Sequence, residues 1–255
     1  MTDAPIAASD AAPEAAPVVA IDGLVKTRRD SERTFTLEVP HLALAAGDRV
    51  ALVGSSGSGK STLIALLALA TGPDEARRFA LWPTPSGAPL DAAAAWRRGD
   101  ERLLTEARAR AIAYVPQRDG LMEFLTVEQN VRTAAELAGA YGTRDLSGIV
   151  EALGLGAVRT AHPARLSGGQ RQRAAVACAL ARNPRLVLAD EPTAALDAGN
   201  AARVMESLVG LAAARGAAIV FATHQLGLVA DYGFTVLAAE TRGANGTWHA
   251  TFAPR

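Results

Sequence analysis

The chain has 255 residues, 49% of them hydrophobic, which is enough for one domain with a substantial core. Its 26 basic side chains equal its 26 acidic ones, so no basic excess points to nucleic acid, and its single cysteine excludes an internal disulfide and suits a reducing cytoplasm. The longest apolar runs, such as Leu63–Ala70, are far shorter than the ~20 residues that span a bilayer, so no membrane span is expected.

The chain begins with a polar segment and a β region. Residues 1–17 are rich in alanine and proline, and they lack the positive start and apolar core of a signal peptide. This composition predicts a disordered tail ahead of a single domain at 18–255. Within that domain, Val18–Ile21 and Phe35–Val39 are predicted to be strands of an antiparallel region.

A strand, a glycine-rich turn and a helix are predicted next. Asp48–Val53 is apolar enough for a buried strand, and Ser61–Ala70 is typical of a buried helix. Glycines let successive backbone N–H groups face phosphate oxygens, and the helix start adds its positive dipole end. Lys60 would reach the β and γ phosphates of a nucleotide and Ser61 would bind Mg²⁺; the alternative is a turn without a ligand. The predicted phosphate-binding residues are Gly54, Ser55, Ser56, Gly57, Ser58, Gly59, Lys60, Ser61 and Thr62.

The proline-containing stretch from Gly72 to Arg110 predicts an irregular hairpin followed by a charged helix at Asp100–Arg110. The charges of this helix are expected to form a solvated face. Trp82 and Trp96 also lie in this stretch, and local packing is the expected role of both.

A short strand and two helices are predicted after this stretch. Ala111–Val115 is a strand, and Gln117 beyond it could contact Mg²⁺ or water with its amide. A capping box at Thr126–Gln129 predicts a helix to about Tyr141, and a second helix is expected at about Leu146–Leu153.

The segment Leu166–Gln170 places two glycines at the start of a helix predicted at Gln170–Arg182. Such a start presents unpaired N–H groups and a positive dipole end, which together favour an anion. Since no second phosphate site is evident in the chain, we expect the segment to serve a nucleotide bound by a partner. Cys178, within the helix, is expected to pack as a small apolar side chain.

Two later strands end in polar residues. Leu186–Ala189 leads into Asp190 and Glu191, at the strand end where open α/β sheets bind ligands. Asp190 would hold Mg²⁺ and Glu191 would orient or deprotonate an attacking water, although two solvated carboxylates are the simpler alternative. Ala217–Thr223 is another buried strand, and His224 at its exit is placed to contact a γ-phosphate.

The alternation of strands and helices predicts an α/β fold with a P-loop NTPase core. Parallel strands near Val50, Val115, Val187 and Val220 would form a mixed sheet covered by helices, beside the antiparallel β subdomain. The mostly helical stretch at about 118–170 would form a second, helical subdomain.

In their order along the chain, these motifs resemble those of the nucleotide-binding subunits of ATP-binding-cassette (ABC) transporters, from about Val18 to about Leu237. A P-loop alone would be equally compatible with a kinase or a GTPase, whereas the segment at 166–170 favours an ABC protein over these classes. The motifs are the P-loop at Gly54–Ser61, the Q-loop Gln117, the signature at Leu166–Gln170, the Walker B strand ending at Asp190 and Glu191, the D-loop at Ala195–Asp197 and the switch residue His224.

The resemblance implies a head-to-tail dimer that holds two ATP molecules with Mg²⁺ between its subunits. The signature would bind the γ-phosphate held by the other subunit's Lys60. Asp197 would cap the following helix and contact the partner, or cap the helix only. The dimer, on the cytoplasmic face of the membrane, would drive a separate permease. The signature residues concerned are Ser167, Gly168, Gly169 and Gln170.

The resemblance also places a docking site for the permease just after Gln117. Leu121, Met122 and Phe124 would face the permease. Alternatively, these side chains are buried locally as a hydrophobic staple for the next helix.

Leu188–Thr193 and Gly54–Gly59 resemble the ATPases of lipoprotein-release, macrolide-efflux and cell-division systems. Some of these transmit force instead of carrying a solute, so an alternative function is to drive an extracytoplasmic process. The pair Ala194 and Ala195, and Gln225 after the switch histidine, depart from the pattern of that group.

The residue that binds the adenine is not evident from the motifs. The family usually offers an aromatic ring to the adenine at the start of the domain, yet none lies between Val18 and Thr34. Arg28 or Arg29 could stack a guanidinium on the base instead, or Phe35 could serve.

Other ATPase classes fit less well. A chromosome-maintenance ATPase needs a long heptad insertion, which residues 60–186 lack, and a translation-type ABC protein needs two cassettes. We therefore predict an ATP-hydrolysing transporter subunit with Glu191, His224 and Gln117 as its catalytic residues.

Overall fold

The computed structural model describes residues 15–29, 33–117, 120–139, 146–194, 196–244 and 247–254. Nearly all of the predicted tail at 1–17 lies outside these residues. So do Tyr141, the predicted end of one helix, and Ala195 of the D-loop.

One mixed sheet runs through the described part of the chain, with its ten strands in the order β5-β4-β1-β2-β10-β9-β3-β8-β7-β6. Parallel pairing joins β3 to β8 and β9, β8 to β7, and β7 to β6, whereas β1 pairs antiparallel with β2 and β4. The strands are β1 (Pro17–Arg29), β2 (Thr34–Ala45), β3 (Arg49–Val53), β4 (Arg78–Leu81), β5 (Leu90–Asp91), β6 (Ile112–Val115), β7 (Leu186–Asp190), β8 (Ala218–Thr223), β9 (Thr235–Ala244) and β10 (Thr247–Pro254).

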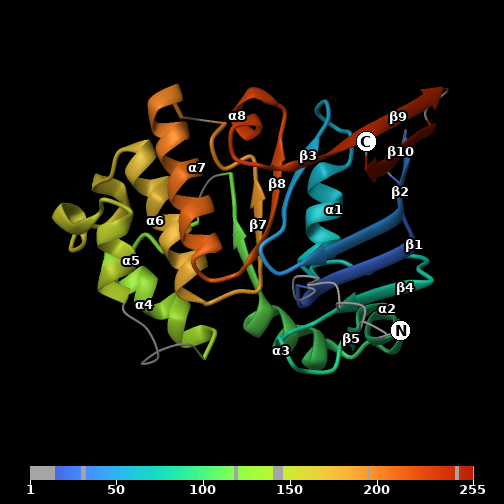
Figure 1. Cartoon of the computed structure of the whole chain (residues 1–255), viewed down its shortest axis with the longest axis horizontal. Helices are drawn as coiled ribbons and strands as arrows, with labels where there is room; N and C mark the ends of the chain where they lie inside the picture. Colours follow the sequence, from blue (N-terminus) through green and yellow to red (C-terminus); the bar gives the residue numbers. More distant parts are fainter. Residues whose placement is uncertain are drawn as a thin grey trace, which may run out of the picture.

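Helices cover both faces of the parallel strands, and Figure 1 shows α1 on one side of β7 and β8 with α4 to α7 on the other. Two short 3₁₀ turns, Gly156–Val158 and Pro163–Arg165, precede α6. The helices are α1 (Lys60–Leu67), α2 (Ala92–Arg98), α3 (Glu101–Ala111), α4 (Val127–Leu137), α5 (Leu146–Ala152), α6 (Gly168–Ala181), α7 (Ala198–Ala213) and α8 (Gly227–Ala230).

Alternation along β7 explains why helices cover both of its faces. Leu186 and Leu188 are buried in a core shared with α1 and the antiparallel strands, whereas Val187 and Ala189 are buried in a core shared with α6 and α7. Successive side chains of a strand point to opposite faces, so a strand that is apolar at every position needs cover on both. The four predicted parallel strands are confirmed as β3, β6, β7 and β8.

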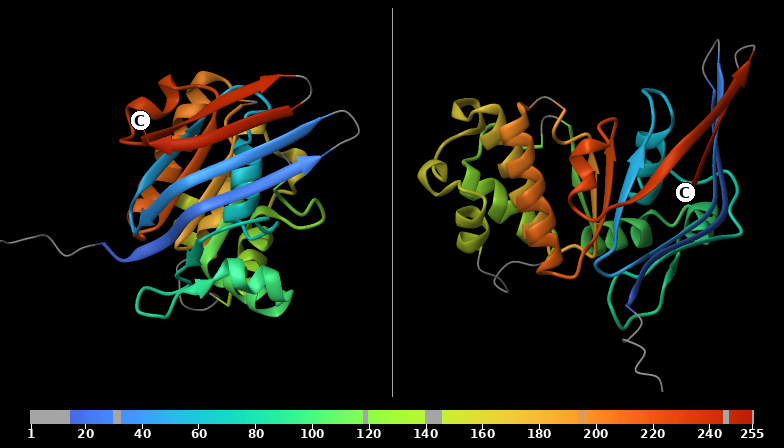
Figure 2. Two further views of the ribbon diagram at one scale, coloured as in Figure 1. Left: turned by 90° about the vertical axis from the view of Figure 1, so that its right-hand side faces the viewer. Right: turned by 45° about the horizontal axis from the view of Figure 1, so that its top comes forward.

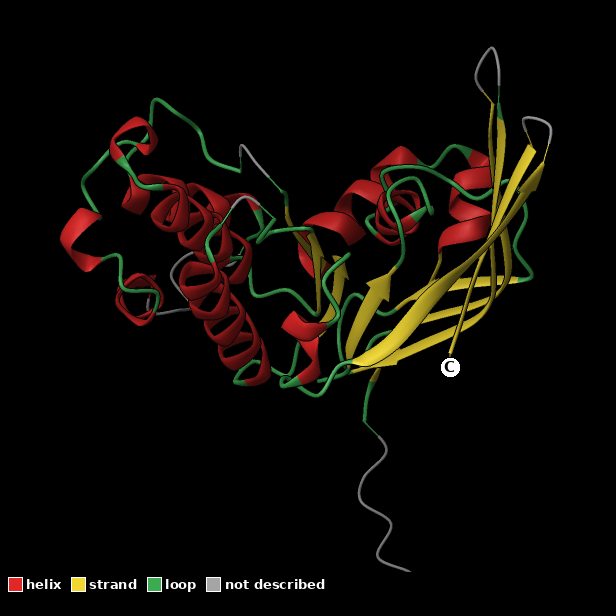
Figure 3. Ribbon diagram, turned by 90° about the horizontal axis from the view of Figure 1, so that it is seen from above, coloured by secondary structure: helices red, strands yellow, loops and turns green. Residues whose placement is uncertain are grey.

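The antiparallel region is larger than predicted. β1 and β2 pair from Pro17↔Ala45 to Arg29↔Thr34, well beyond the predicted Val18–Ile21 and Phe35–Val39. The C-terminal hairpin of β9 and β10 joins this region, because β10 pairs in parallel with β2. Figure 2 shows these four long strands side by side, and Figure 3 shows them at the opposite end of the molecule from the helices around α6.

Several local predictions are confirmed, and one helix is new. Thr126 and Gln129 form the predicted reciprocal capping box at the start of α4. The helix predicted at Asp100–Arg110 is α3, with Asp100 as its N-cap. The preceding stretch contains the predicted hairpin, β4–β5, and also the unpredicted α2. None of the described helices combines the length and the apolar character needed to cross a bilayer.

Candidate functional site

The glycine-rich turn connects β3 to α1 as predicted. Gly59 is the N-cap of α1 with φ 93°, a left-handed conformation that costs glycine little, and no side chain of the described residues caps this helix start. A Cβ at Gly54 would collide with the hydroxyl of Ser58, and that buried hydroxyl has no hydrogen-bond partner within the described residues. The turn therefore offers N–H and hydroxyl donors to an anion.

Lys60 lies at the centre of the site and is only 5% exposed. Its ammonium donates to the carbonyl oxygens of Gly54 at 2.8 Å and Ser55 at 3.1 Å, so the P-loop itself fixes its position. Its Nζ also lies 3.6 Å from Oε1 of Glu191. The lysine is thus held where the turn and the end of β7 meet.

Glu191 has a left-handed backbone, with φ 46°, directly after β7. A non-glycine residue in this conformation costs about 1–3 kcal/mol, and such strain is concentrated at functional sites. Its N–H donates to the carbonyl of Ala222 at 3.0 Å, which ties it to β8, and its Oε2 lies 3.4 Å from Nδ1 of His224. One carboxylate therefore joins Lys60 on one side to His224 on the other.

A cavity of about 740 Å³ opens beside this trio. Ser61, Asp190 and Gln117 line it together and offer a hydroxyl, a carboxylate and an amide oxygen, the hard ligands that Mg²⁺ accepts. In the described part of the chain, no three His, Cys, Asp or Glu side chains group into a metal cage. The donor set fits a Mg²⁺ that is completed by phosphate oxygens, which is the usual way this ion is bound.

Aromatic and basic side chains also line this cavity. Arg28, Arg29 and Phe35, the three candidates for contact with a base, all line it. So does Trp248 of β10, which sequence reasoning missed because no motif surrounds it. The alternation around Trp248 in β10 could have predicted a strand, but not that this strand lies beside β2.

The signature segment forms a separate structure at the start of α6. Ser167 is the N-cap, and it exchanges two hydrogen bonds with Gln170: Gln170 N–H donates to Ser167 Oγ at 3.2 Å, and Ser167 N–H donates to Gln170 Oε1 at 2.9 Å. A Cβ on Gly169 would lie 2.7 Å from Oδ1 of Asn200 on α7. None of residues 166–170, all of them described, lines the cavity beside Lys60.

Asp197 caps α7 next to the signature, as predicted. Its carboxylate accepts hydrogen bonds from the backbone N–H of Asn200 at 3.0 Å and from the side-chain amide of Asn200 at 2.6 Å, and these two bonds lower the pKa of Asp197. Since Asn200 also lies against Gly169, the D-loop and the signature share one contact residue.

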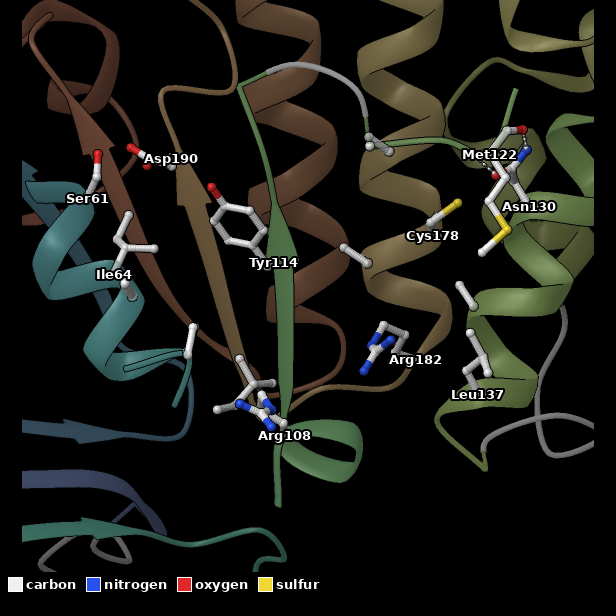
Figure 4. A pocket seen from close by; sticks show the side chains of 18 of the residues that line it. Ser61, Ile64, Arg108, Tyr114, Met122, Asn130, Leu137, Cys178, Arg182 and Asp190 are labelled. Atoms are coloured by element: carbon white, nitrogen blue, oxygen red, sulfur yellow. Dashed lines mark hydrogen bonds between the residues drawn. The ribbon is translucent and has the colours of Figure 1, made fainter. Parts of the chain in front are cut away.

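A second hollow, of about 640 Å³, lies between α1, β6, α4 and α6. Figure 4 shows Tyr114 in its middle, between Ser61 and Asp190 on one side and Cys178 and Met122 on the other. Burial, together with the charge of Asp190, raises the pKa of Tyr114. Burial raises the pKa of the Cys178 thiol to about 12, which agrees with the predicted apolar role of this cysteine. The hollow borders the nucleotide cavity, because Ser61 and Asp190 line both.

The three apolar residues predicted to dock the permease point in different directions. Leu121 packs against the helical core, Met122 is 41% exposed and lines the second hollow, and Phe124 is 76% exposed. Asn130 holds their loop, since its buried amide accepts from Met122 N–H and donates to the carbonyls of Met122, Leu125 and Thr126.

A strand, a glycine-rich turn with a lysine, and a helix, with an acidic residue at the end of the second parallel strand along the sheet, define a P-loop nucleoside triphosphatase. Residues 37–194 match the ABC transporter family model. The chain therefore belongs to the ABC transporter family, as its motifs predicted, and it is an ATPase.

Curated relatives and solved structures agree with this family. The "lipoprotein-releasing system ATP-binding protein LolD 2" of Rhodopseudomonas palustris is 37% identical over 84% of this chain and 89% of its own length. The LolD protein of Legionella pneumophila is 36% identical over 79% of this chain and 86% of its own length. The dimeric ATP-binding cassette MJ0796, in a post-hydrolysis state bound to ADP and Pi, has a TM-score of 0.71 at 27% identity and covers 90% of this chain and 95% of that one. These relatives support the predicted likeness to the lipoprotein-release group.

Proposed function

We propose that this chain is the ATP-hydrolysing subunit of a lipoprotein-release-type transporter, and that it powers a separate membrane permease from the cytoplasmic face. Two copies would associate head to tail with two ATP molecules between them. The dimeric cassette bound to ADP and Pi, which shares this fold, supports the association. The lipoprotein-releasing relatives support the transporter class.

Within one subunit, the P-loop would hold the phosphates. N–H groups from Gly54 to Thr62 would cradle them, and Lys60 would turn its ammonium from the carbonyls of Gly54 and Ser55 to the β and γ phosphates. Ser61, Asp190 and Gln117 would hold Mg²⁺, which neutralises charge on phosphate oxygens during transfer.

The carboxylate of Glu191 would orient and deprotonate the attacking water. Its position between Lys60 and His224 favours this role, because both neighbours can hold the carboxylate at a fixed place. His224 would contact the γ-phosphate from the end of β8. A positioned general base contributes about 10²–10⁴ in rate.

The observation that carries the proposal is the separation of the two phosphate-handling segments. Ser167 and its neighbours Gly168, Gly169 and Gln170 form a helix start of the kind that binds anions, yet none of them lines the cavity beside Lys60. A second subunit would bring its own signature to that cavity, with Asp197 alongside. Each complete site would then contain residues from two copies.

The permease would dock at the second hollow and the adjoining loop. The apolar side chains there include Met122 in the hollow and Phe124 outside it, and the hollow shares Ser61 and Asp190 with the nucleotide cavity. A permease segment seated in the hollow would therefore contact residues next to the bound nucleotide. This arrangement would couple hydrolysis to movement of the permease.

A complementation experiment tests the shared site. Lys60→Ala removes the P-loop function and Ser167→Arg blocks the signature, so each variant alone should be inactive. In a mixed dimer, one site combines both defects and the other combines the intact P-loop of one copy with the intact signature of the other. With random pairing and independent sites, about a quarter of wild-type activity should return.

Sites contained within one subunit would give no recovery in such a mixture. Unchanged activity of Ser167→Arg alone would equally contradict the proposal. Circular dichroism of both variants checks that loss of activity is not loss of folding.

A further inference from the structure

We infer that the indole of Trp248, on the C-terminal hairpin, is the platform on which the nucleobase of the bound nucleotide stacks. The inference rests on the proposed function, since it names a further contact of the same nucleotide. It assigns the base contact to a strand that lies outside every motif recognised in the sequence.

The first argument is the position of Trp248 along one row of the sheet. Arg28 of β1 pairs with Phe35 of β2, Phe35 pairs with Trp248 of β10, and Trp248 pairs with Gly243 of β9. Paired residues on neighbouring strands project to the same face. Arg28, Phe35 and Trp248 all line the cavity that contains the P-loop, so this row faces the nucleotide.

The second argument is that the ring of Phe35 is already packed against the P-loop. A Cβ on Gly59 would lie 2.8 Å from Cζ of Phe35, so the ring edge packs directly against the P-loop glycine, and Phe35 is also packed against the core. Phe35 therefore supports the phosphate turn. Trp248 lies one strand further from this contact and is 46% exposed.

The third argument is chemical. Among the described residues lining the cavity, Phe35 and Trp248 are the aromatic ones, and Trp248 alone of the two is exposed. An indole face stacks on a base through its large π surface, and such stacking tolerates different bases. Arg28 and Arg29, on the far side of Phe35, are then left to meet the negative charge of the nucleotide.

Gly243 fixes the indole from the other side. A Cβ there would lie 2.5 Å from Cδ2 and Cε3 of Trp248, so the ring covers this glycine and any larger residue would displace it. The indole is thus held in place by the strand beneath it, which lowers the entropy lost when a base stacks on it.

The test compares a ligand that has a base with one that lacks it. Affinities of the full-length protein for ATP and for inorganic tripolyphosphate are measured by calorimetry in the wild type, Trp248→Ala, Trp248→Phe and His249→Ala. We expect Trp248→Ala to weaken ATP binding about 5-fold to 150-fold, the range that base–aromatic stacking supplies, and to leave tripolyphosphate binding unchanged. Trp248→Phe should retain most of the wild-type affinity for ATP. His249 is next in the strand and points to the other face, so His249→Ala should change neither affinity.

A double-variant cycle and a fluorescence measurement extend the test. Gly243→Ala should weaken ATP binding in the presence of Trp248 and add nothing to Trp248→Ala. The chain has three tryptophans, so replacing Trp82 and Trp96 by phenylalanine leaves Trp248 as the sole indole. Its emission should be quenched by ATP and unaffected by tripolyphosphate.

If Trp248→Ala weakens the binding of ATP and of tripolyphosphate equally, the indole only stabilises the sheet. If it weakens neither, the indole has no role in binding. Both results overturn the inference. So would a selective loss of ATP in Arg28→Ala with none in Trp248→Ala, since the platform would then be a guanidinium. Failure of the wild type to bind ATP, or ATP binding that ignores Lys60→Ala, would instead contradict the proposed function itself.

Discussion

Replacing Glu191 by glutamine should separate ATP binding from hydrolysis. Glutamine keeps the size and shape of the side chain, so its amide can take the place of the carboxylate between Lys60, 3.6 Å away, and His224, 3.4 Å away. It cannot accept a proton from water. Lys60 keeps the carbonyls of Gly54 and Ser55 as partners, so the P-loop should remain intact.

The expected magnitude follows from the loss of a general base. Turnover should fall about 10²–10⁴-fold, which corresponds to about 2.7–5.5 kcal/mol of transition-state stabilisation. ATP should bind at least as tightly as in the wild type, because the substitution removes a negative charge close to the phosphates. Uncleaved ATP should then hold the two subunits together as a stable dimer.

The assay combines phosphate release with light scattering during gel filtration in the presence of ATP. Glu206→Gln, which removes an exposed carboxylate from α7, is the matched control and should behave as the wild type does. Retention of most of the turnover by Glu191→Gln would remove Glu191 from the role of base. Loss of ATP binding would show that the carboxylate supports the P-loop and that the proposed division of roles is wrong.

Three further predictions concern stability and docking. Asn130→Ala should lower the free energy of unfolding by about 1–3 kcal/mol, because the N–H of Met122 loses its acceptor and the carbonyl of Leu125 loses its donor. Urea denaturation measures this change, and an unchanged free energy would mean that water replaces the amide. Burial raises the pKa of Cys178 from 9.0 to about 12, so the thiol loses its proton at a lower pH in the unfolded chain than in the folded one. The free energy of unfolding should therefore fall between pH 9 and about 12, and this fall should be smaller in Cys178→Ala. An equal fall in both proteins would show that the thiol is not buried. Phe124→Asp should leave stability and ATP binding unchanged and abolish stimulation of ATP hydrolysis by the proposed permease, because Phe124 is exposed. Leu121→Asp should destabilise the fold, because Leu121 packs against the helical core. Equal destabilisation by the two variants would place Phe124 in the core instead.

Local sequence patterns predicted those parts of the fold that local physics determines. Leu186–Ala189 is apolar at each position and lies between two helical layers, and Gly59 takes the left-handed conformation that a phosphate turn requires. The N-caps predicted at Thr126 and Asp197 are also present, because capping depends on residues only three apart.

The features that the sequence did not reveal depend on long-range pairing or lack a clear period. The run of alanines in α2 has no helical pattern of apolar and polar residues, although Asp91 and Gly99 cap it at its two ends. The pairing of β10 with β2 joins residues more than two hundred positions apart, and no local pattern can show it. Trp248 was missed for this reason.

Helix α6 connects the parts of the site that the motifs describe separately. Its start carries Ser167 and meets Asn200, the residue that Asp197 binds. One turn on, the buried side chain of Gln172 donates to the carbonyl of Pro116 at 3.0 Å, immediately before Gln117. Further along, Cys178 lines the hollow proposed for the permease. Because a helix moves as a rigid element, we expect a shift of the loop at Gln117 to move the signature of the same subunit, and with it the site that we propose the two subunits share.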